Sequence, residues 1–216
     1  MGWMENIWKD VVQPMIDTKT PWAFTMGNHD SEADLTDREL ADLDSTYPLS
    51  LTSNGPLHVK GSTNYVLSIF SNSSDVPSFN LWFLDSGKED CIGWQGKNFS
   101  QRFFCSIDEI NRALGWGCIE SSQIDWYEKK SQQFTKMNDN EVIPAMAFFH
   151  IPLPEYMDLW NTEETEGNMN EGMICCSSQN TGFFSSIKKM GDINSIYCGH
   201  DHKNDYQGNY FFKLKK

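Results

Sequence analysis

Apolar residues recur along this chain with two alternating spacings, one helical and one typical of strands. Over residues 1–18 they lie about one helical turn apart, which predicts an amphipathic helix, although Pro14 weakens its last turn. The residues that carry this spacing are Trp3, Ile7, Val11 and Met15. Further helices are predicted over residues 33–45, 121–136 and 182–190.

Short apolar runs that end at turn-forming residues predict β-strands. These runs span residues 21–26, 64–70, 80–84, 143–149, 193–198 and 209–214. Strands that alternate with helices indicate an α/β fold whose sheet is covered on its faces. Two segments between them are predicted to be surface loops, namely residues 88–118 and the acidic, Asn- and Gly-rich residues 159–172.

Size and composition predict one globular domain over residues 1–216. Hydrophobic residues make up 39% of the chain and aromatic residues 13%, which is enough to build a sizeable core. No apolar run approaches the roughly 20 residues of a membrane helix, and the N-terminus lacks the layout of a signal peptide. We therefore expect no membrane partner.

Charge narrows the choice of partner. The chain has 30 acidic and 17 basic residues, a formal net charge of -13. So acidic a surface repels a polyphosphate backbone, and we expect no nucleic-acid partner. It would also repel a phosphate substrate unless bound divalent cations reverse the local field. Charge alone does not distinguish such an enzyme from an ordinary acidic protein.

Cysteines leave the cellular compartment open. The chain has six, and no two are spaced as Cys-x-x-Cys, so a structural zinc site is poorly supported. Three disulfides in a secreted protein and buried free thiols are equally compatible with this pattern. The cysteines are Cys91, Cys105, Cys118, Cys175, Cys176 and Cys198.

Histidines gather in three polar clusters, each directly after a predicted strand. The clusters are Gly27-Asn28-His29-Asp30, the single His150, and Gly199-His200-Asp201-His202. In open α/β sheets the carboxyl ends of the strands line the ligand crevice, so we expect these clusters to converge. Imidazole nitrogen and carboxamide oxygen suit borderline cations such as Zn, Mn and Fe.

Within the clusters, Asn28 offers a neutral oxygen ligand, and its neighbour His29 can remain off the metal as an acid. Asp30 can hold the His29 ring through a hydrogen bond. His200 and His202 point the same way on an extended segment, whereas in a turn they can straddle two ions. A glycine before them, Gly199, leaves room for the backbone to bend.

Each of these features also has a purely structural interpretation. A single histidine after a strand, such as His150, is more often a residue of the surface or the core edge. Gly-Asn-His-Asp is also a good turn sequence. We interpret His58 as a surface residue and Asp85 as a structural residue before a turn. It is the combination of three clusters in this order that favours a metal site.

In this combination the chain resembles the calcineurin-like metallophosphoesterases. Residues 27–30 resemble the family's Gly-Asn-His-Asp/Glu motif, His150 its isolated histidine, and residues 199–202 its Gly-His-x-His motif. The segments around these motifs are similar to the small single-domain branch related to purple acid phosphatases. They are residues 21–23, 83–87, 149–156 and 176–184.

The resemblance implies a four-layer sandwich, with two mixed sheets between helices, that hydrolyses a small phosphorylated substrate. Two Fe, Mn or Zn ions about 3.5–4 Å apart would stabilise the entering and departing oxygens. By the same resemblance Asn28, His150 and His200 bind one ion and His202 the other. The catalytic residues would be His29, which contacts the phosphate and protonates the leaving alkoxide, and its partner Asp30.

One departure from the family pattern changes the expectation. The family's Asp-x-His and Gly-Asp motifs precede Gly-Asn-His, and neither occurs here. The acidic residues upstream are Glu5, Asp10 and Asp17, all within the first predicted helix. We therefore expect a domain truncated at its N-terminus and an incomplete or inactive phosphatase. The alternative is a non-catalytic, mononuclear metal-binding or scaffold domain. Metal identity, natural substrate and oligomeric state are not predicted.

Overall fold

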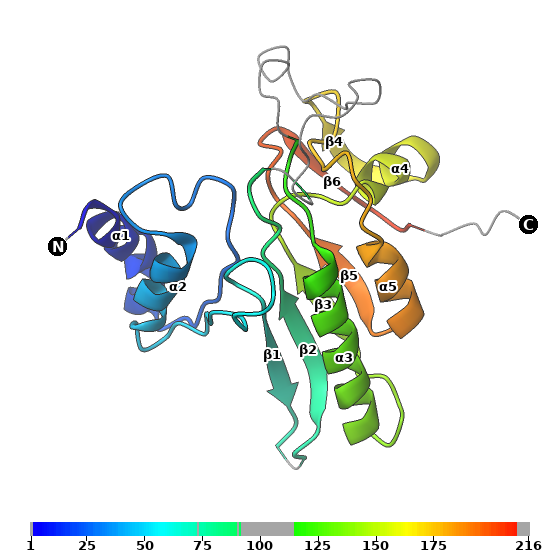
Figure 1. Cartoon of the computed structure of the whole chain (residues 1–216), viewed down its shortest axis with the longest axis horizontal. Coiled ribbons are helices and arrows are strands. Elements are labelled where there is room, and N and C mark those ends of the chain that lie inside the picture. The colour runs from blue at the N-terminus through cyan, green and yellow to red at the C-terminus, as the bar shows by residue number, and fades with distance from the viewer. Residues whose placement is uncertain (1, 73, 90, 92–114, 211–216) are drawn as a thin grey trace, which may run out of the picture.

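The computed structural model describes residues 2–72, 74–89, 91 and 115–210. Helices and strands alternate over this part of the chain (Figure 1). The helices are α1 Trp3–Thr18, α2 Asp37–Ser45, α3 Ser121–Met137, α4 Glu155–Thr162 and α5 Phe183–Met190. The strands are β1 Tyr65–Phe70, β2 Pro77–Phe83, β3 Ala145–Phe148, β4 Thr165–Met169, β5 Ile193–Tyr197 and β6 Asn204–Gly208. No helix among these residues combines the length and the apolar character needed to cross a lipid bilayer.

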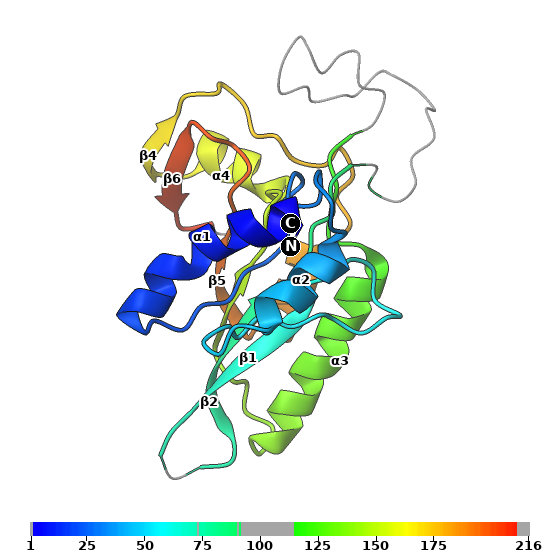
Figure 2. The same cartoon turned by 90° about the vertical axis from the view of Figure 1, so that its left-hand side faces the viewer.

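The strands form two separate sheets. The larger has the order β1-β2-β3-β5, with β1 antiparallel to β2 and the other two pairs parallel. The smaller is the antiparallel pair β4-β6. Helices α3 and α5 cover one face of the larger sheet, whereas α1 and α2 lie beyond β1 (Figures 1 and 2). The predicted α/β class, with two sheets flanked by helices, is therefore confirmed.

Alternation along β3 and the middle of β2 buries one face of the larger sheet. Trp82, Ala145 and Ala147 are fully buried under α3 and α5. The Trp82 ring meets Trp126 edge-on at a centroid distance of 5.5 Å and Tyr127 at 5.1 Å. Small alanines on the neighbouring strand leave room for these rings. Burial of such aromatic side chains is the main stabilising contribution of this layer.

The opposite face carries a row of aromatic rings, one from each strand. They are Tyr65 on β1, Phe83 on β2, Phe148 on β3 and Tyr197 on β5. Neighbouring rings are stacked with centroids 4.7 to 5.2 Å apart, because the strand register places these residues opposite one another. The row packs along β3 and β5, whose following residues lead to His150 and His200.

A buried carboxylate joins α3 to the start of β5. Asp192 accepts hydrogen bonds from the hydroxyls of Tyr127 and Ser131, the latter at 2.7 Å. Its Oδ1 also accepts the Ile193 backbone N–H at 2.9 Å. The side chain is only 3% exposed, so these donors replace the water that the carboxylate loses on folding.

A second apolar cluster joins α1, α2 and the segment between them. Met26, Leu40 and Ala41 form its buried centre. The carboxylate of Asp44 lies fully buried beside it and accepts the indole N–H groups of Trp8 at 2.8 Å and Trp22 at 2.9 Å. These contacts fix the segment that leads to the Gly27-Asn28-His29-Asp30 motif.

Most predicted elements are found, but two predictions are wrong. Residues 21–26 form no strand; their only β-contact among the described residues is the bridge between Trp22 and Ser50. The hydroxyls of Thr52 and Thr63 accept the N–H groups of Phe24 and Met26, so side chains replace the ladder that a neighbouring strand would supply.

The other error concerns residues 159–172, which contain the end of α4 and all of β4 rather than a loop, because β4 pairs with β6 far along the sequence. Of the strand predicted over 209–214, only Asn209 and Tyr210 lie in the described part of the chain, where they follow β6 and form no strand. The remainder of that prediction, residues 211–214, lies outside the described residues. Most of the loop predicted over residues 88–118 also lies outside them.

Some of the cysteines form disulfides and others are free thiols, so each of the two interpretations left open above holds for part of them. Cys91 is bonded to Cys118, and Cys175 is also in a disulfide. Cys176 and Cys198 are free, and desolvation raises the pKa of their thiols to about 11 and about 12. Both thiols therefore stay protonated and unreactive at neutral pH.

Candidate metal centre

Three side chains from distant parts of the sequence meet beyond the ends of β3 and β5. His150 follows β3 by two residues, His200 follows β5 by three, and Asn28 comes from the loop after residues 21–26. The Gly199 N–H donates to the His150 carbonyl at 3.0 Å, which ties the two strand ends together. The convergence expected of the strand ends is found for these three residues.

Their potential ligand atoms form a small triangle. Asn28 Oδ1 lies 2.8 Å from His150 Nε2 and 3.3 Å from His200 Nδ1, and the two nitrogens are 3.3 Å apart. Ligand atoms about 2.1 Å from one ion lie about 3.0 Å apart in octahedral and about 3.4 Å apart in tetrahedral coordination. The triangle therefore has the dimensions of one face of a single metal site. We call Asn28, His150 and His200 the donor triad.

The backbone of His200 is bent to bring its ring into the triad. Its φ is 74°, in the left-handed region that residues with a Cβ rarely adopt. The Asp201 N–H donates to the Gly199 carbonyl at 2.9 Å, which closes a tight three-residue γ-turn around His200. Such a conformation costs on the order of 1–3 kcal/mol, and strain of this kind concentrates at functional sites.

Both imidazoles of the triad favour their neutral form. Burial lowers the pKa of His150, with the nearby Asp30 carboxylate opposing this effect. Burial, followed by the proximity of His150, lowers the pKa of His200 to about 4. A neutral imidazole keeps a lone pair for a cation, so at neutral pH the donor set fits a metal such as Zn, Mn or Fe.

The structure gives the His29 ring a different partner from the one expected. Asp30 was expected to hold the His29 ring, but His29 Nδ1 lies 2.7 Å from Glu32 Oε1. The Asp30 carboxylate instead accepts the Gly27 N–H at 2.7 Å. Glu32, three residues after His29, is thus the partner of the His29 ring that sequence reasoning missed. The His29 side chain is 61% exposed, as access to a substrate requires.

His202 remains outside the donor triad. Among the described residues, no His, Cys, Asp or Glu brings a third ligand atom within 4.8 Å of the two triad imidazoles. The exposed His202 is nevertheless close enough to contribute to the lowered pKa of both His150 and His200. Its assignment to a second metal ion stays a prediction.

Buried residues after β2 hold the backbone segments near the triad through hydrogen bonds. Ser86, fully buried, accepts the Ile151 N–H at 2.8 Å and so holds the peptide that follows His150. Asp85 accepts the N–H groups of Ser62 at 2.6 Å and Gly87 at 2.9 Å, which agrees with its interpretation as a structural residue. Burial raises the pKa of this carboxyl.

Two neighbours of the site were not foreseen. The Trp116 ring contacts the His200 ring edge-on, at a centroid distance of 4.3 Å. The Lys88 ammonium contacts Ser31 Oγ and lies 3.4 Å from Asp37 Oδ1, which places a cation beside the loop that carries His29. Both residues lie in the segment predicted as a surface loop, and no motif signals them.

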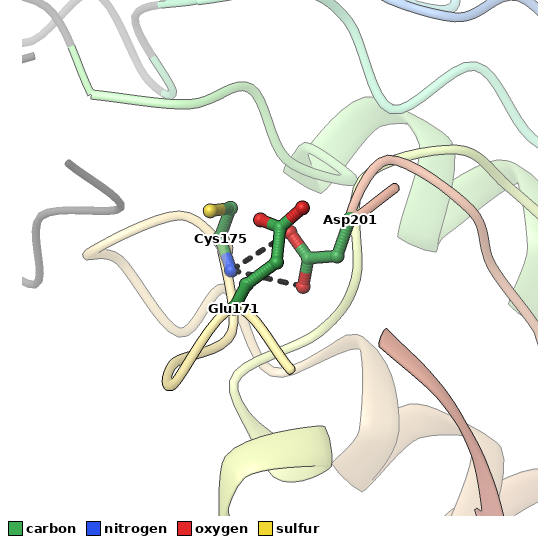
Figure 3. Close-up of side chains that lie close together, drawn as sticks. All are labelled: Glu171, Cys175 and Asp201. Atoms are coloured by element: carbon green, nitrogen blue, oxygen red, sulfur yellow. Dashed lines mark hydrogen bonds between the residues drawn. The ribbon is translucent and has the colours of Figure 1, made fainter. Parts of the chain in front are cut away.

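Another group of potential ligands lies nearby but does not fit a metal. Figure 3 shows Glu171, Cys175 and Asp201 close together, with the Asp201 carboxylate accepting the Cys175 backbone N–H at 3.2 Å. Because Cys175 is disulfide-bonded, its sulfur cannot act as a thiolate ligand. Asp201 also accepts the Asn204 side-chain N–H at 3.0 Å. This cluster supports the turn that carries His200.

The fold and the donor triad define a class of protein, the calcineurin-like phosphoesterases. The chain matches this family over residues 3–204 and belongs to it. The match covers all three polar clusters and both sheets up to the start of β6. No solved structure matches the chain significantly.

Curated relatives are purple acid phosphatase-like proteins. The chain is 31% identical to "Probable inactive purple acid phosphatase 29" of Arabidopsis thaliana, with 90% of this chain and 49% of that protein aligned. It is 32% identical to "Phosphatase DCR2" of Saccharomyces cerevisiae, with 94% of this chain and 33% of that protein aligned. The chain thus spans about half or less of the length of these relatives.

Proposed function

We propose that this chain supplies one metal site of a phosphate-ester hydrolase, with Asn28, His150 and His200 as protein ligands. The observation that carries the proposal is the donor triangle, whose edges of 2.8, 3.3 and 3.3 Å match one coordinated cation. A divalent cation bound there would polarise a phosphoryl oxygen and offset the negative charge of a substrate. His202 is the candidate ligand of a second ion.

His29 is the proposed proton donor. With Nδ1 against Glu32 Oε1 at 2.7 Å, Nε2 is the nitrogen able to pass a proton to the leaving oxygen. Glu32 orients the ring through this contact. Lys88, which contacts Ser31 and forms an ion pair with Asp37, places an ammonium group beside the same loop. A small phosphorylated substrate fits this arrangement better than a nucleic acid. We propose that residues 1–216 form a single domain that carries this site.

A second candidate is a non-catalytic domain that binds one metal ion. The three triad ligands are all neutral, and among the described residues no carboxylate comes within 4.8 Å of both imidazoles to bridge two ions. Two dications side by side would then repel each other with little compensation. The word "inactive" in the name of the Arabidopsis thaliana relative favours this candidate as well.

Metal stoichiometry and turnover, measured on the same preparations, test both candidates. We expect Mn, Fe or Zn to bind the 216-residue chain at the triad, and His150→Ala or His200→Ala to weaken this binding about 100-fold or more. His58→Ala is the matched control, since His58 is an exposed histidine outside the three clusters.

Hydrolysis of an aryl phosphate then separates the outcomes. Metal-dependent turnover that His150→Ala abolishes supports the hydrolase. One bound ion without turnover supports the second candidate. If the unmodified chain takes up no metal, or if His58→Ala weakens binding as much as His150→Ala, both candidates are wrong.

A further inference from the structure

Trp116 is the one aromatic ring outside the triad that contacts a triad imidazole among the described residues. Its ring centroid lies 4.3 Å from that of His200, with the two planes at 78°. The His200 ring also meets the His150 ring, at 5.1 Å and again 78°. The imidazole therefore packs against both an indole and the second histidine, and these contacts restrict rotation of its side chain.

The segment that carries Trp116 is fastened to the turn after β2. Trp116 forms an antiparallel bridge with Glu89, and the Gly117 N–H donates to the Lys88 carbonyl at 3.1 Å. Gly117 packs so closely on this turn that an added Cβ would overlap the Ser86 carbonyl oxygen. The next residue, Cys118, is disulfide-bonded to Cys91. We call residues 115–118 the Trp116 stem.

The same turn also supports the other histidine of the triad. Ser86 Oγ accepts the N–H of Ile151, the residue after His150, at 2.8 Å. One compact unit, made of the turn at residues 86–89 and the Trp116 stem, therefore contacts the surroundings of both histidines. Of the two histidines, His200 has the strained backbone, with a φ of 74°.

We propose that Trp116 is a positioning residue for His200, and that the Cys91–Cys118 disulfide keeps Trp116 in place, so that metal affinity depends on this disulfide. The inference rests on the proposed metal site and adds a redox dependence to it. Reduction by a dithiol breaks the S–S bond; the two sulfurs gain two electrons and two protons, and the dithiol becomes a disulfide. The stem then remains attached by its backbone contacts alone.

Substitutions in the full chain test the positioning role, with Co²⁺ as the probe because its visible spectrum reports coordination geometry. Trp116→Ala should weaken Co²⁺ binding about tenfold and change the spectrum, whereas Trp116→Phe should restore most of both. Trp160→Ala is the matched control. The half-buried Trp160 ring lies on α4 and contacts the Tyr206 ring of β6 at a centroid distance of 5.0 Å.

A double-mutant cycle tests the role of the disulfide. Cys91→Ser/Cys118→Ser should weaken Co²⁺ binding in the unmodified background but add little to Trp116→Ala, because the disulfide acts through the indole. Additive effects would contradict this link, as would wild-type affinity in the serine variant. Wild-type affinity and an unchanged spectrum in Trp116→Ala would overturn the proposal as a whole.

A metal-free measurement separates this inference from the proposed function. In NMR spectra of the apo chain, the NOE contacts between the His200 and His150 ring protons should weaken on Trp116→Ala and persist on Trp160→Ala. If the unmodified chain binds no Co²⁺, the proposed function fails. NOE contacts that Trp116→Ala leaves unchanged show instead that the indole does not position the ring.

Discussion

The two imidazoles of the triad bind protons less readily than free histidines, which leaves their nitrogens available to a cation. The folded-state pKa of His200 is lowered to about 4 by burial and by the neighbouring His150, against an unfolded value of 6.5. Between these values the unfolded chain binds a proton that the folded chain does not. The contribution of His200 to stability is therefore complete above pH 6.5 and is lost as the pH falls towards 4.

The stability of the metal-free chain should depend on pH within this window. The urea concentration at the unfolding midpoint of the metal-free chain should decrease as the pH is lowered from 6.5 to 4. His200→Ala should make this decrease smaller. Urea unfolding at a series of pH values measures it, with His58→Ala as the control. An equal slope in the wild type and His200→Ala would show that the ring of His200 is not buried in its neutral form.

Sequence reasoning at the residue scale reached the triad but not its surroundings. Asn28, His150 and His200 each follow a strand or an extended run, and this position alone brings them together. Glu32, Trp116 and the left-handed φ of His200 depend on contacts between segments distant in sequence or on loop geometry. No spacing rule contains that information.

Elements were predictable where a single segment carries its own signal. Helix α3 was expected over 121–136 and spans Ser121–Met137, because capping and periodicity are local. The pair β4-β6 was missed, since Thr165–Met169 and Asn204–Gly208 are largely polar and exposed and become strands only by pairing. Residues 21–26 show the opposite error, a strand that was predicted but not found. Their apolar run has no neighbouring strand to pair with, so here too pairing decides whether a strand forms.

At the scale of elements, the joint between α3 and β5 should be sensitive to Asp192. Asp192→Ala leaves the buried hydroxyls of Tyr127 and Ser131 without their acceptor, and we expect a loss of roughly 2–4 kcal/mol in the free energy of unfolding. Chemical denaturation measures it. Asp125→Ala, which removes an exposed carboxylate of α3, should change stability by less than about 0.5 kcal/mol. Similar losses for the two variants would exclude this role for Asp192.

Over the whole molecule, a net charge of -13 opposes the approach of an anionic substrate. Raising the ionic strength from about 10 mM to about 150 mM shortens the Debye length from about 30 Å to about 8 Å and screens this repulsion. Association of inorganic phosphate with the metal-loaded chain should therefore become faster as NaCl is added. Stopped-flow kinetics measures this rate, and a rate that falls with salt would mean that local cations dominate the field.

The central claim is that one cation binds where the three parts of the chain meet. Its most direct test is an anomalous difference map from crystals grown with Mn or Zn. We expect a peak about 2.1 Å from Asn28 Oδ1, His150 Nε2 and His200 Nδ1. A map with no peak at the triad, or with its peak between Glu171 and Asp201, would contradict the account.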